Sequence, residues 1–141
     1  SRQSPLWVGG GVMFGPKPRD YRKKLSKNMK RQALLSAVLG KIQDDEALVT
    51  ENLDLRMPKT REMARVLDNL GVDDSFLVVL PEPDARLWRC ARNLPGSAMN
   101  GVENLNALEV LEHKYLLFTR EGLDAFIERC GLETADAAVE E

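Results

Sequence analysis

The chain alternates short apolar runs with segments of helical periodicity, and this alternation limits the folds open to it more than any other feature. The run 76–80 (Phe-Leu-Val-Val-Leu) is apolar throughout, and 115–119 (Tyr-Leu-Leu-Phe-Thr) is nearly so. Strands that are apolar on both faces are typical of a parallel sheet, because the helices that connect parallel strands cover both sides. The sequence therefore predicts an α/β domain with a parallel sheet between two layers of helices and right-handed connections.

Turn residues and helix caps place the individual elements. We expect strands at 47–52, 76–80, 97–100 and 115–119. We expect a helix over 60–70, which Gly71 ends, and a second helix over 84–93. A helical turn is expected over 105–111, and a last helix should run from its cap Thr119 to Cys130.

A further helix precedes these elements. It begins either near Asp20 or at the N-cap Ser26, and should end about Gly40, where a glycine can adopt the left-handed closing conformation. In its first half we expect four cations on one side, facing away from the core: Lys23, Lys27, Lys30 and Arg31. The other side carries Leu25, Met29 and Ala33. In its second half apolar residues surround the helix axis, so we expect this half to be buried beneath the sheet. These residues are Leu34, Leu35, Ala37, Val38 and Leu39.

Charge is divided unevenly along the chain. Residues 1–35 carry nine Lys or Arg against the single Asp20, a net +8, whereas residues 36–141 carry a net −10. Glycines and prolines between positions 9 and 18 oppose both helix and sheet, so this stretch is expected to be extended and to lie on a polyanion. We interpret 1–20 as a basic arm, 21–131 as the α/β domain, and 132–141 as an acidic, frayed tail.

Length and composition are those of one domain. The 141 residues are 43% hydrophobic, which is enough for a core. No apolar run approaches the roughly 20 residues that span a bilayer, and the start Ser-Arg-Gln-Ser-Pro has no apolar signal-peptide region. These features favour a soluble intracellular protein. Cys90 and Cys130 are expected to be buried small side chains rather than metal ligands or a disulfide pair.

Residues suited to catalysis or metal binding are sparse. His113 is the only histidine and has no nucleophile at a recognisable elbow, so we interpret it as a surface or loop residue. The acidic runs 44–46 and 73–74 are typical of solvated turns. The glycine-rich stretch 9–15 lacks the preceding strand and the following helix of a phosphate loop. The acidic turn 81–84 (Pro-Glu-Pro-Asp), after the second strand, would repel a phosphate.

The arm carries three aromatic residues, Trp7, Phe14 and Tyr21, interleaved with cations. The cations are Arg2, Lys17, Arg19, Arg22, Lys23 and Lys24. Such a combination favours RNA binding, because cations contact phosphates and planar rings stack on unpaired bases. The alternative is a solvated run of charge, and the aromatic residues in an unstructured stretch weigh against it.

Several motifs are similar to those of one family. The segment 14–21 (Phe-Gly-Pro-Lys-Pro-Arg-Asp-Tyr), together with 4–7 and 9–11, resembles the bacterial-type large-subunit ribosomal protein four. The likeness covers about residues 2–130 and includes the segments 58–60, 91–96, 105–106 and 116–119. The resemblance implies a three-layer α/β/α domain with a four-stranded parallel sheet and a long loop that threads into ribosomal RNA toward the peptide exit tunnel. It implies a structural role on the cytoplasmic ribosome, with no enzymatic activity and no cofactor.

The chain departs from the family pattern in three places. Family members have an N-terminal segment and the outgoing half of the loop before the position of Ser1. The resemblance therefore implies a chain truncated at its N-terminus that lacks part of the RNA-contacting surface. Val8 stands where an arginine is common, which would remove one phosphate contact. The segment 87–90 (Leu-Trp-Arg-Cys) also differs from the usual stretch, and this affects local packing.

The combined interpretation is an RNA-binding structural component of the large ribosomal subunit. Its expected partners are large-subunit rRNA and neighbouring ribosomal proteins, with no membrane and no small-molecule substrate. Phosphate contacts are expected from Lys17, Arg19, Arg22, Lys23, Lys27, Lys30 and Arg31, and by family analogy a polar contact from Arg92 and Asn93. Stacking is expected from Trp7, Phe14 and Tyr21, and the alternative for Tyr21 is packing against the first helix.

Two other classes stay open at this point. One is an enzyme that binds a nucleotide or phosphate metabolite on a doubly wound sheet, which the fold alone permits. The other is a protein-only interaction module that uses the acidic face.

Overall fold

The globular part of the molecule is built on a parallel sheet. The structure is a computed structural model that describes residues 3–53 and 59–131. The strands are β1 (Ala47–Thr50), β2 (Phe76–Leu80), β3 (Ser97–Gly101) and β4 (Tyr115–Thr119). They lie in the order β1-β4-β2-β3, and each neighbouring pair is parallel. The predicted α/β fold with a four-stranded parallel sheet is therefore confirmed.

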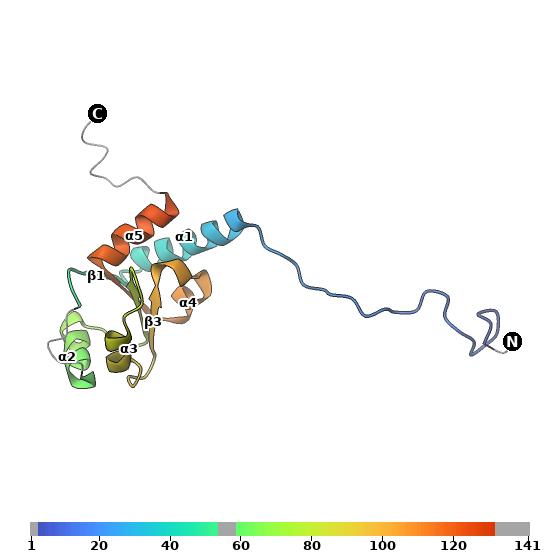
Figure 1. Ribbon diagram of the computed structural model, residues 1–141, viewed down its shortest axis with the longest axis horizontal. Coiled ribbons are helices and arrows are strands. Elements are labelled where there is room, and N and C mark those ends of the chain that lie inside the picture. Colours follow the sequence, from blue (N-terminus) through green and yellow to red (C-terminus); the bar gives the residue numbers. More distant parts are fainter. Residues whose placement is uncertain (1–2, 54–58, 132–141) are drawn as a thin grey trace, which may run out of the picture.

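Helices cover both faces of the sheet. Within the described ranges they are α1 (Lys27–Gln43), α2 (Thr60–Leu70), α3 (Ala85–Ala91), the short 3-10 helix η1 (Val102–Asn104), α4 (Ala107–Glu112) and α5 (Arg120–Cys130). Figure 1 shows α1, α4 and α5 on one side of the sheet and α2 and α3 on the other. The arrangement is the expected three-layer sandwich.

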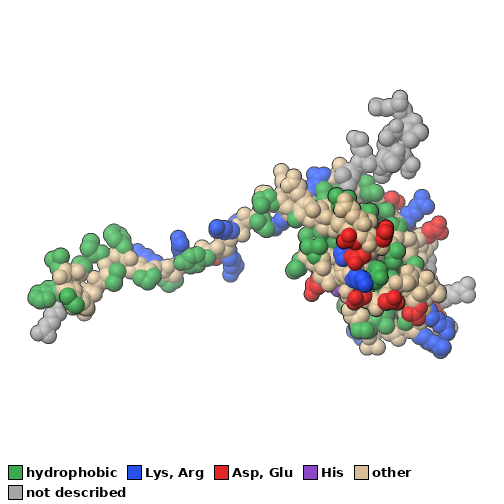
Figure 2. Space-filling view, turned by 180° about the vertical axis from the view of Figure 1, so that it is seen from behind, with side chains coloured by type: hydrophobic (Ala, Val, Ile, Leu, Met, Phe, Trp, Pro, Cys, Tyr) green, Lys and Arg blue, Asp and Glu red, His purple; other side chains and the backbone are tan. Residues whose placement is uncertain are grey.

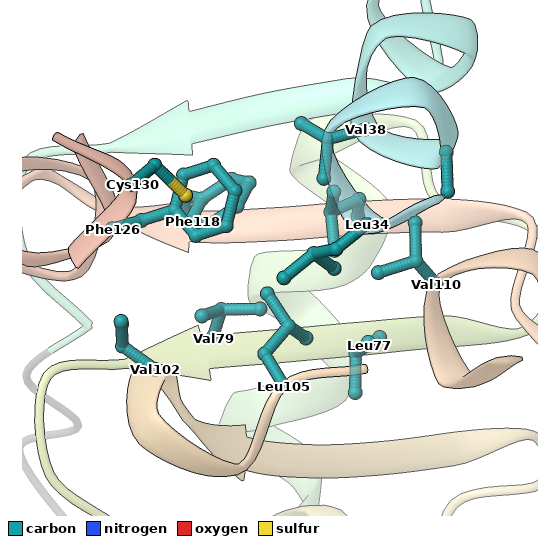
Figure 3. Close-up of a cluster of buried hydrophobic side chains, with 12 residues drawn as sticks. Leu34, Val38, Leu77, Val79, Val102, Leu105, Val110, Phe118, Phe126 and Cys130 are labelled. Atoms are coloured by element: carbon teal, nitrogen blue, oxygen red, sulfur yellow. The ribbon is translucent and has the colours of Figure 1, made fainter. Parts of the chain in front are cut away.

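The sheet separates two hydrophobic clusters, because successive side chains of a strand point to opposite faces. On the α1 side, Leu77 and Val79 of β2 pack with side chains of α1, α4 and α5 (Figure 3). On the other side, Phe76, Val78 and Leu80 pack against α2 and α3. All five residues of β2 are buried, as its wholly apolar sequence predicted.

Caps set most of the element boundaries. The Thr119 hydroxyl accepts a hydrogen bond from the Gly122 N–H at 3.1 Å, and α5 begins at the next residue, as predicted. Gly71 closes α2 in the left-handed conformation, with φ 72°. Of the two predicted starts of the first helix, Ser26 is the correct one, because its side chain accepts from the Met29 N–H at 3.3 Å.

The predicted end of the first helix is wrong. Gly40 lies inside α1, which continues to Gln43. The chain leaves the helix at Asp44 and turns at Asp45, whose φ of 56° is positive, before it enters β1. Aspartate tolerates this conformation better than most residues, so the turn does not need glycine. The prediction that Leu39 is buried is also wrong, since it is 54% exposed.

Smaller differences concern the shorter elements. Strand β1 ends at Thr50 rather than residue 52, and α3 stops at Ala91 rather than 93. The expected turn over 105–111 is instead η1 followed by α4, whose N-cap Asn106 accepts from the Glu109 N–H at 2.9 Å. The predicted tail 132–141 lies outside the described residues. Cys90 and Cys130 are both buried and free, as expected.

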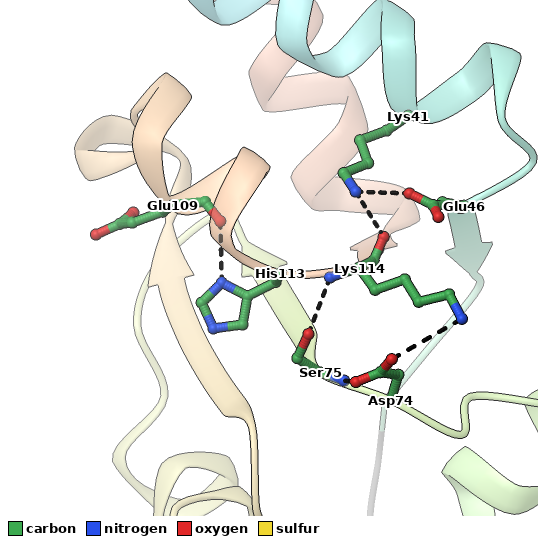
Figure 4. A network of polar contacts seen from close by, with 7 residues as sticks. All are labelled: Lys41, Glu46, Asp74, Ser75, Glu109, His113 and Lys114. Carbon is green, nitrogen blue, oxygen red and sulfur yellow. Dashed lines mark hydrogen bonds and ion pairs between the residues drawn. The ribbon is translucent and has the colours of Figure 1, made fainter.

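Charged residues at the amino edge of the sheet hold the strands together (Figure 4). The Lys41 ammonium pairs with Glu46 at 2.6 Å and donates to the Lys114 carbonyl at 2.9 Å. The Lys114 N–H donates to the Ser75 hydroxyl at 3.0 Å. His113 ends α4, with its Nδ1 2.9 Å from the Glu109 carbonyl, so its contact is a local, structural one. The predicted loop position of His113 is therefore correct.

Candidate nucleic-acid interface

The N-terminal residues of the described chain form an extended arm. Residues 3–26 contain no helix or strand, and Figure 1 shows them projecting away from the domain. The far end closes into a small loop, in which the Gly11 N–H donates to the Gln3 carbonyl at 3.0 Å and the Gly10 N–H to the Trp7 carbonyl at 2.9 Å. A Cβ at Gly10 would lie 2.0 Å from the main-chain carbonyl oxygen of Ser4, so this loop requires glycine at position 10.

The three aromatic residues predicted to stack on bases are exposed. Trp7 is 64% exposed, Phe14 90% and Tyr21 74%. Figure 2 shows hydrophobic side chains along the arm with Lys and Arg between them. Exposed aromatic groups of this size ordinarily mark a binding surface, because leaving them in water is unfavourable.

Two of these rings flank a hollow in the middle of the arm. Phe14, Gly15, Pro16, Lys17, Arg19 and Tyr21 surround a space of about 460 Å³. The Arg19 guanidinium lies over the Tyr21 ring, with Cζ 4.5 Å from the centroid, in a cation–π contact. The partner of Tyr21 is thus a residue of the arm, and the alternative of packing against the first helix is wrong.

Most of the arm's cations are available to a ligand. Arg22 makes an exposed local pair with Asp20, whose carboxylate is 3.7 Å from Arg22 Nε and accepts from the Arg22 N–H at 2.9 Å. Such solvated pairs contribute little to stability and open easily. Lys17, Lys23 and Lys24 are exposed and have no side-chain partner among the described residues. Arg2 lies outside the described residues.

The predicted orientation of the basic helix stripe is wrong. Lys27, Lys30 and Arg31 precede the buried Leu34 by seven, four and three residues, and residues so spaced share one face of a helix. These cations therefore continue the core-facing stripe. They are exposed because the first turns of α1 extend beyond the sheet (Figure 1), where no strand lies beneath them. Lys23 precedes the helix and does not share its face.

The start of α1 forms one wall of a groove of about 900 Å³, with residues 103–107 and the end of α5 opposite. Lys27, Lys30 and Arg31 line this groove, and so does Arg129, which the sequence analysis did not single out. One guanidinium N–H of Arg31 donates to the Cys130 carbonyl at the end of α5. Burial raises the pKa of the Cys130 thiol, and the nearby Arg129 and Arg31 partly oppose this.

The remaining predicted contacts, Arg92 and Asn93, lie apart from the arm. Both are exposed at the end of α3, on the face of the sheet opposite α1. The structure therefore does not bring them together with the α1 stripe. The same face carries Arg61, Arg65 and Arg89, which the sequence analysis missed. Their spacing by three or four residues within helices was the available signal.

The carboxyl edge of the sheet, where an α/β enzyme would bind a nucleotide, has an acidic groove of about 710 Å³. Glu82, Glu103 and Glu128 line it, and its one arginine, Arg129, donates to the Val102 carbonyl. Among the described residues no group of three or more His, Cys, Asp or Glu is placed to hold a metal ion. This edge is unfavourable for a phosphate, as its sequence predicted.

No helix in the described ranges is both long enough and apolar enough to cross a bilayer.

Comparison with known proteins gives a clear match. The family model described as "Ribosomal protein L4/L1 family" matches residues 1–129. "Large ribosomal subunit protein uL4" of Natranaerobius thermophilus is 38% identical over 128 residues, which cover 91% of this chain and 62% of that protein. The protein of the same name from Oceanobacillus iheyensis is 43% identical over 124 residues, covering 88% and 60%.

A third protein of that name, from Thermodesulfovibrio yellowstonii, is 42% identical over 133 residues, which cover 94% of this chain and 63% of that protein. The chain therefore spans about three fifths of the length of these curated relatives. The matched region includes the arm, the sheet and the helices described above, apart from the last residue of α5, Cys130. This chain belongs to the ribosomal protein L4/L1 family.

Proposed function

We propose that the chain is a structural rRNA-binding protein of the large ribosomal subunit. In this proposal the arm is inserted into rRNA toward the peptide exit tunnel, and the domain docks on the rRNA surface. The observation that carries the proposal is the arm itself, an extended segment with three exposed aromatic rings and cations that lack partners in the described chain.

The chemistry of the arm fits RNA better than other ligands. A base has a π-face that stacks on Trp7, Phe14 or Tyr21, and such stacking is worth about 1 to 3 kcal/mol per base. Lys17, Lys23 and neighbouring cations add phosphate contacts that release counterions. Glycines let the backbone approach a folded RNA closely. The relatives named above support a large-subunit component, and the proposed role is structural rather than enzymatic.

Amide hydrogen exchange tests whether the arm binds RNA. Exchange over residues 3–26 should be fast in the free chain and slowed by bacterial large-subunit rRNA. Amides of β2 serve as the internal control, because they are protected in both states by the sheet. Small-subunit rRNA at the same salt concentration is the RNA control. Unchanged exchange of the arm in the presence of large-subunit rRNA would contradict the proposal.

A tethered cleavage reagent tests the position of the arm. The native thiols are buried, with Cys90 1% and Cys130 3% exposed, so Met13→Cys places a single reactive thiol on the arm. Met13 is itself 74% exposed, so the change leaves the fold intact. After assembly into large subunits, a hydroxyl-radical probe on this thiol should cleave rRNA that lines the exit tunnel. Cleavage confined to the outer surface of the subunit would contradict the insertion of the arm.

A further inference from the structure

The groove of about 900 Å³ between the start of α1 and the end of α5 combines cationic and apolar lining residues. Figure 1 shows these two helix ends close together. Of the described residues that line the groove, Glu103 alone is acidic. The cations that line it are Lys27, Lys30, Arg31 and Arg129. The apolar residues are Leu25, Met29, Ala33, Leu34, Leu105 and Ala107. The groove is therefore suited to a segment that carries both acidic and apolar side chains.

The cations of this groove keep hydrogen-bond donors for a ligand. Within the described ranges the ammonium groups of Lys27 and Lys30 form no hydrogen bond or ion pair. Arg31 and Arg129 each donate to main-chain carbonyls, and a guanidinium has five N–H donors, so neither is fully used. The first turn of α1 also contains no acidic residue, which leaves the positive end of the helix dipole unbalanced.

The chain leaves α5 at the wall of this groove. Gly131 closes α5 in the left-handed conformation, and a Cβ at this position would lie 3.6 Å from a guanidinium nitrogen of Arg31. The tail, residues 132–141, follows in the sequence and lies outside the described range. It has no Lys or Arg, two larger apolar residues, Leu132 and Val139, and four acids: Glu133, Asp136, Glu140 and Glu141. The charge of the tail is therefore opposite to that of the groove.

Chain geometry brings the groove within reach of the tail. An extended chain spans at most about 3.6 Å per residue, so Glu133 and Asp136 can lie up to about 7 and 18 Å from Gly131. Lys27 precedes Arg31 by four residues, which is about 6 Å along the axis of a helix. The acids of the tail can therefore meet the cations of α1 while the tail stays attached to α5.

We propose that the tail docks in this groove and competes with RNA for its cations. The carboxylates pair with Lys27 and Lys30, and Leu132 contacts the apolar lining. Attachment to α5 keeps the tail at a high local concentration, so ion pairs that are individually weak suffice. The competition rests on the proposed function, because it presupposes that RNA binds at the start of α1. The apparent affinity for RNA then falls in proportion to the fraction of chains whose groove is open.

Amide NMR of the full chain tests the docking without RNA. The neutral-tail variant replaces the four acids: Glu133→Gln, Asp136→Asn, Glu140→Gln and Glu141→Gln. Amide shifts of residues 27–31 and 103–107 should differ between wild type and this variant. Amides of α2 and α3, on the opposite face of the sheet, are the internal control and should agree. At about 1 M salt, where screening acts over about 3 Å, the differences should disappear. Differences confined to residues next to the substitutions would overturn the proposal.

Affinity for bacterial large-subunit rRNA tests the competition. At low salt the neutral-tail variant should bind about three- to tenfold more tightly than wild type, because a few exposed ion pairs no longer close the groove. The matched control removes the same charge from four exposed acids that do not line the groove: Glu51→Gln, Asp73→Asn, Glu82→Gln and Glu112→Gln. It measures the effect of net charge alone and should give a smaller gain. An equal gain in the control would overturn the competition.

A second background locates the effect in the groove. In a chain that carries Lys27→Gln and Lys30→Gln, neutralising the tail should raise affinity no more than the control set does, because the tail has lost its partners. A full gain in that background would refute docking in this groove. If no variant binds large-subunit rRNA, the proposed function fails and the competition fails with it. If RNA binds but the neutral tail changes neither the amide shifts nor the affinity, only the docking of the tail is refuted.

Discussion

Arg31 of α1 donates a guanidinium hydrogen bond to the main-chain carbonyl of Cys130, the last residue of α5. The carbonyls at the end of a helix lack intrahelical partners and carry partial negative charge, so a cation there is favourable. The contact joins the first turns of α1, where the arm begins, to the end of α5. Arg31 therefore positions the helix that carries the arm, in addition to any phosphate it contacts.

Replacing Arg31 should lower the stability of the domain. Arg31→Gln removes the bond to Cys130 and should reduce the free energy of unfolding by about 1 kcal/mol. Lys30→Gln is the matched control on the adjacent position, and should stay within about 0.5 kcal/mol of wild type, because Lys30 has no partner in the described chain. Urea unfolding measures both. Equal effects of the two substitutions would show that the bond contributes nothing.

Two glycines in helices should respond to alanine in opposite directions. A Cβ at Gly122 would lie 2.7 Å from the Val79 carbonyl oxygen, so Gly122→Ala should cost about 1 to 3 kcal/mol by forcing α5 away from β2. A Cβ at Gly40 would meet nothing within 4 Å, so Gly40→Ala should stabilise α1 by about 0.5 to 1 kcal/mol. A stabilising effect at position 122 would mean that α5 packs less closely than described.

The fold was predictable where local sequence decides the structure. Strand β2 needs apolar residues on both faces, and its bounds were predicted correctly from that pattern alone. The caps at Thr119 and Gly71 likewise act through neighbouring residues. Gly40 misled the prediction, because a glycine permits the left-handed conformation without requiring it. The helix ends instead at Asp44 and Asp45, where the chain turns into β1.

The candidate site was predictable only in part, because some of its features depend on tertiary structure rather than on the local sequence. The exposed rings of Trp7 and Phe14 followed from a stretch that has no hydrophobic period. The orientation of Lys27 and Lys30 depends on where the sheet ends beneath α1, which is a tertiary fact that the helix sequence does not contain. The bond from Arg31 to Cys130 joins residues 99 positions apart, beyond any local pattern.

Alkaline pH should weaken the domain through Cys130. Burial raises the pKa of this thiol, so as pH rises the unfolded chain ionises before the folded one. The stability that the neutral thiol contributes is complete below its ordinary pKa of about 8.5 and is lost as pH rises toward the folded value. The difference in unfolding free energy between wild type and Cys130→Ala should therefore shrink above about pH 8.5. A difference that does not change with pH would contradict this.

Removing the start of the arm should leave the domain folded. In the described part of the chain, residues 3–18 supply no side chain to either hydrophobic cluster, so deletion of residues 1–18 should leave the urea midpoint unchanged. Val78→Asp provides the contrast, because Val78 is fully buried and an unpaired charge there should cost several kcal/mol. Unfolding caused by the deletion would show that the arm is part of the fold.

The central claim, that the arm and the start of α1 bind RNA through phosphates and stacked bases, is tested most directly by the salt dependence of rRNA binding. Replacing Lys23, Lys24, Lys27 and Lys30 with Gln should flatten the slope of log affinity against log salt by about three units. Trp7→Ala should lower affinity by about 1 to 3 kcal/mol and leave the slope nearly unchanged, because stacking releases no counterions. A wild-type slope in the fourfold variant, together with wild-type affinity for Trp7→Ala, would contradict the account.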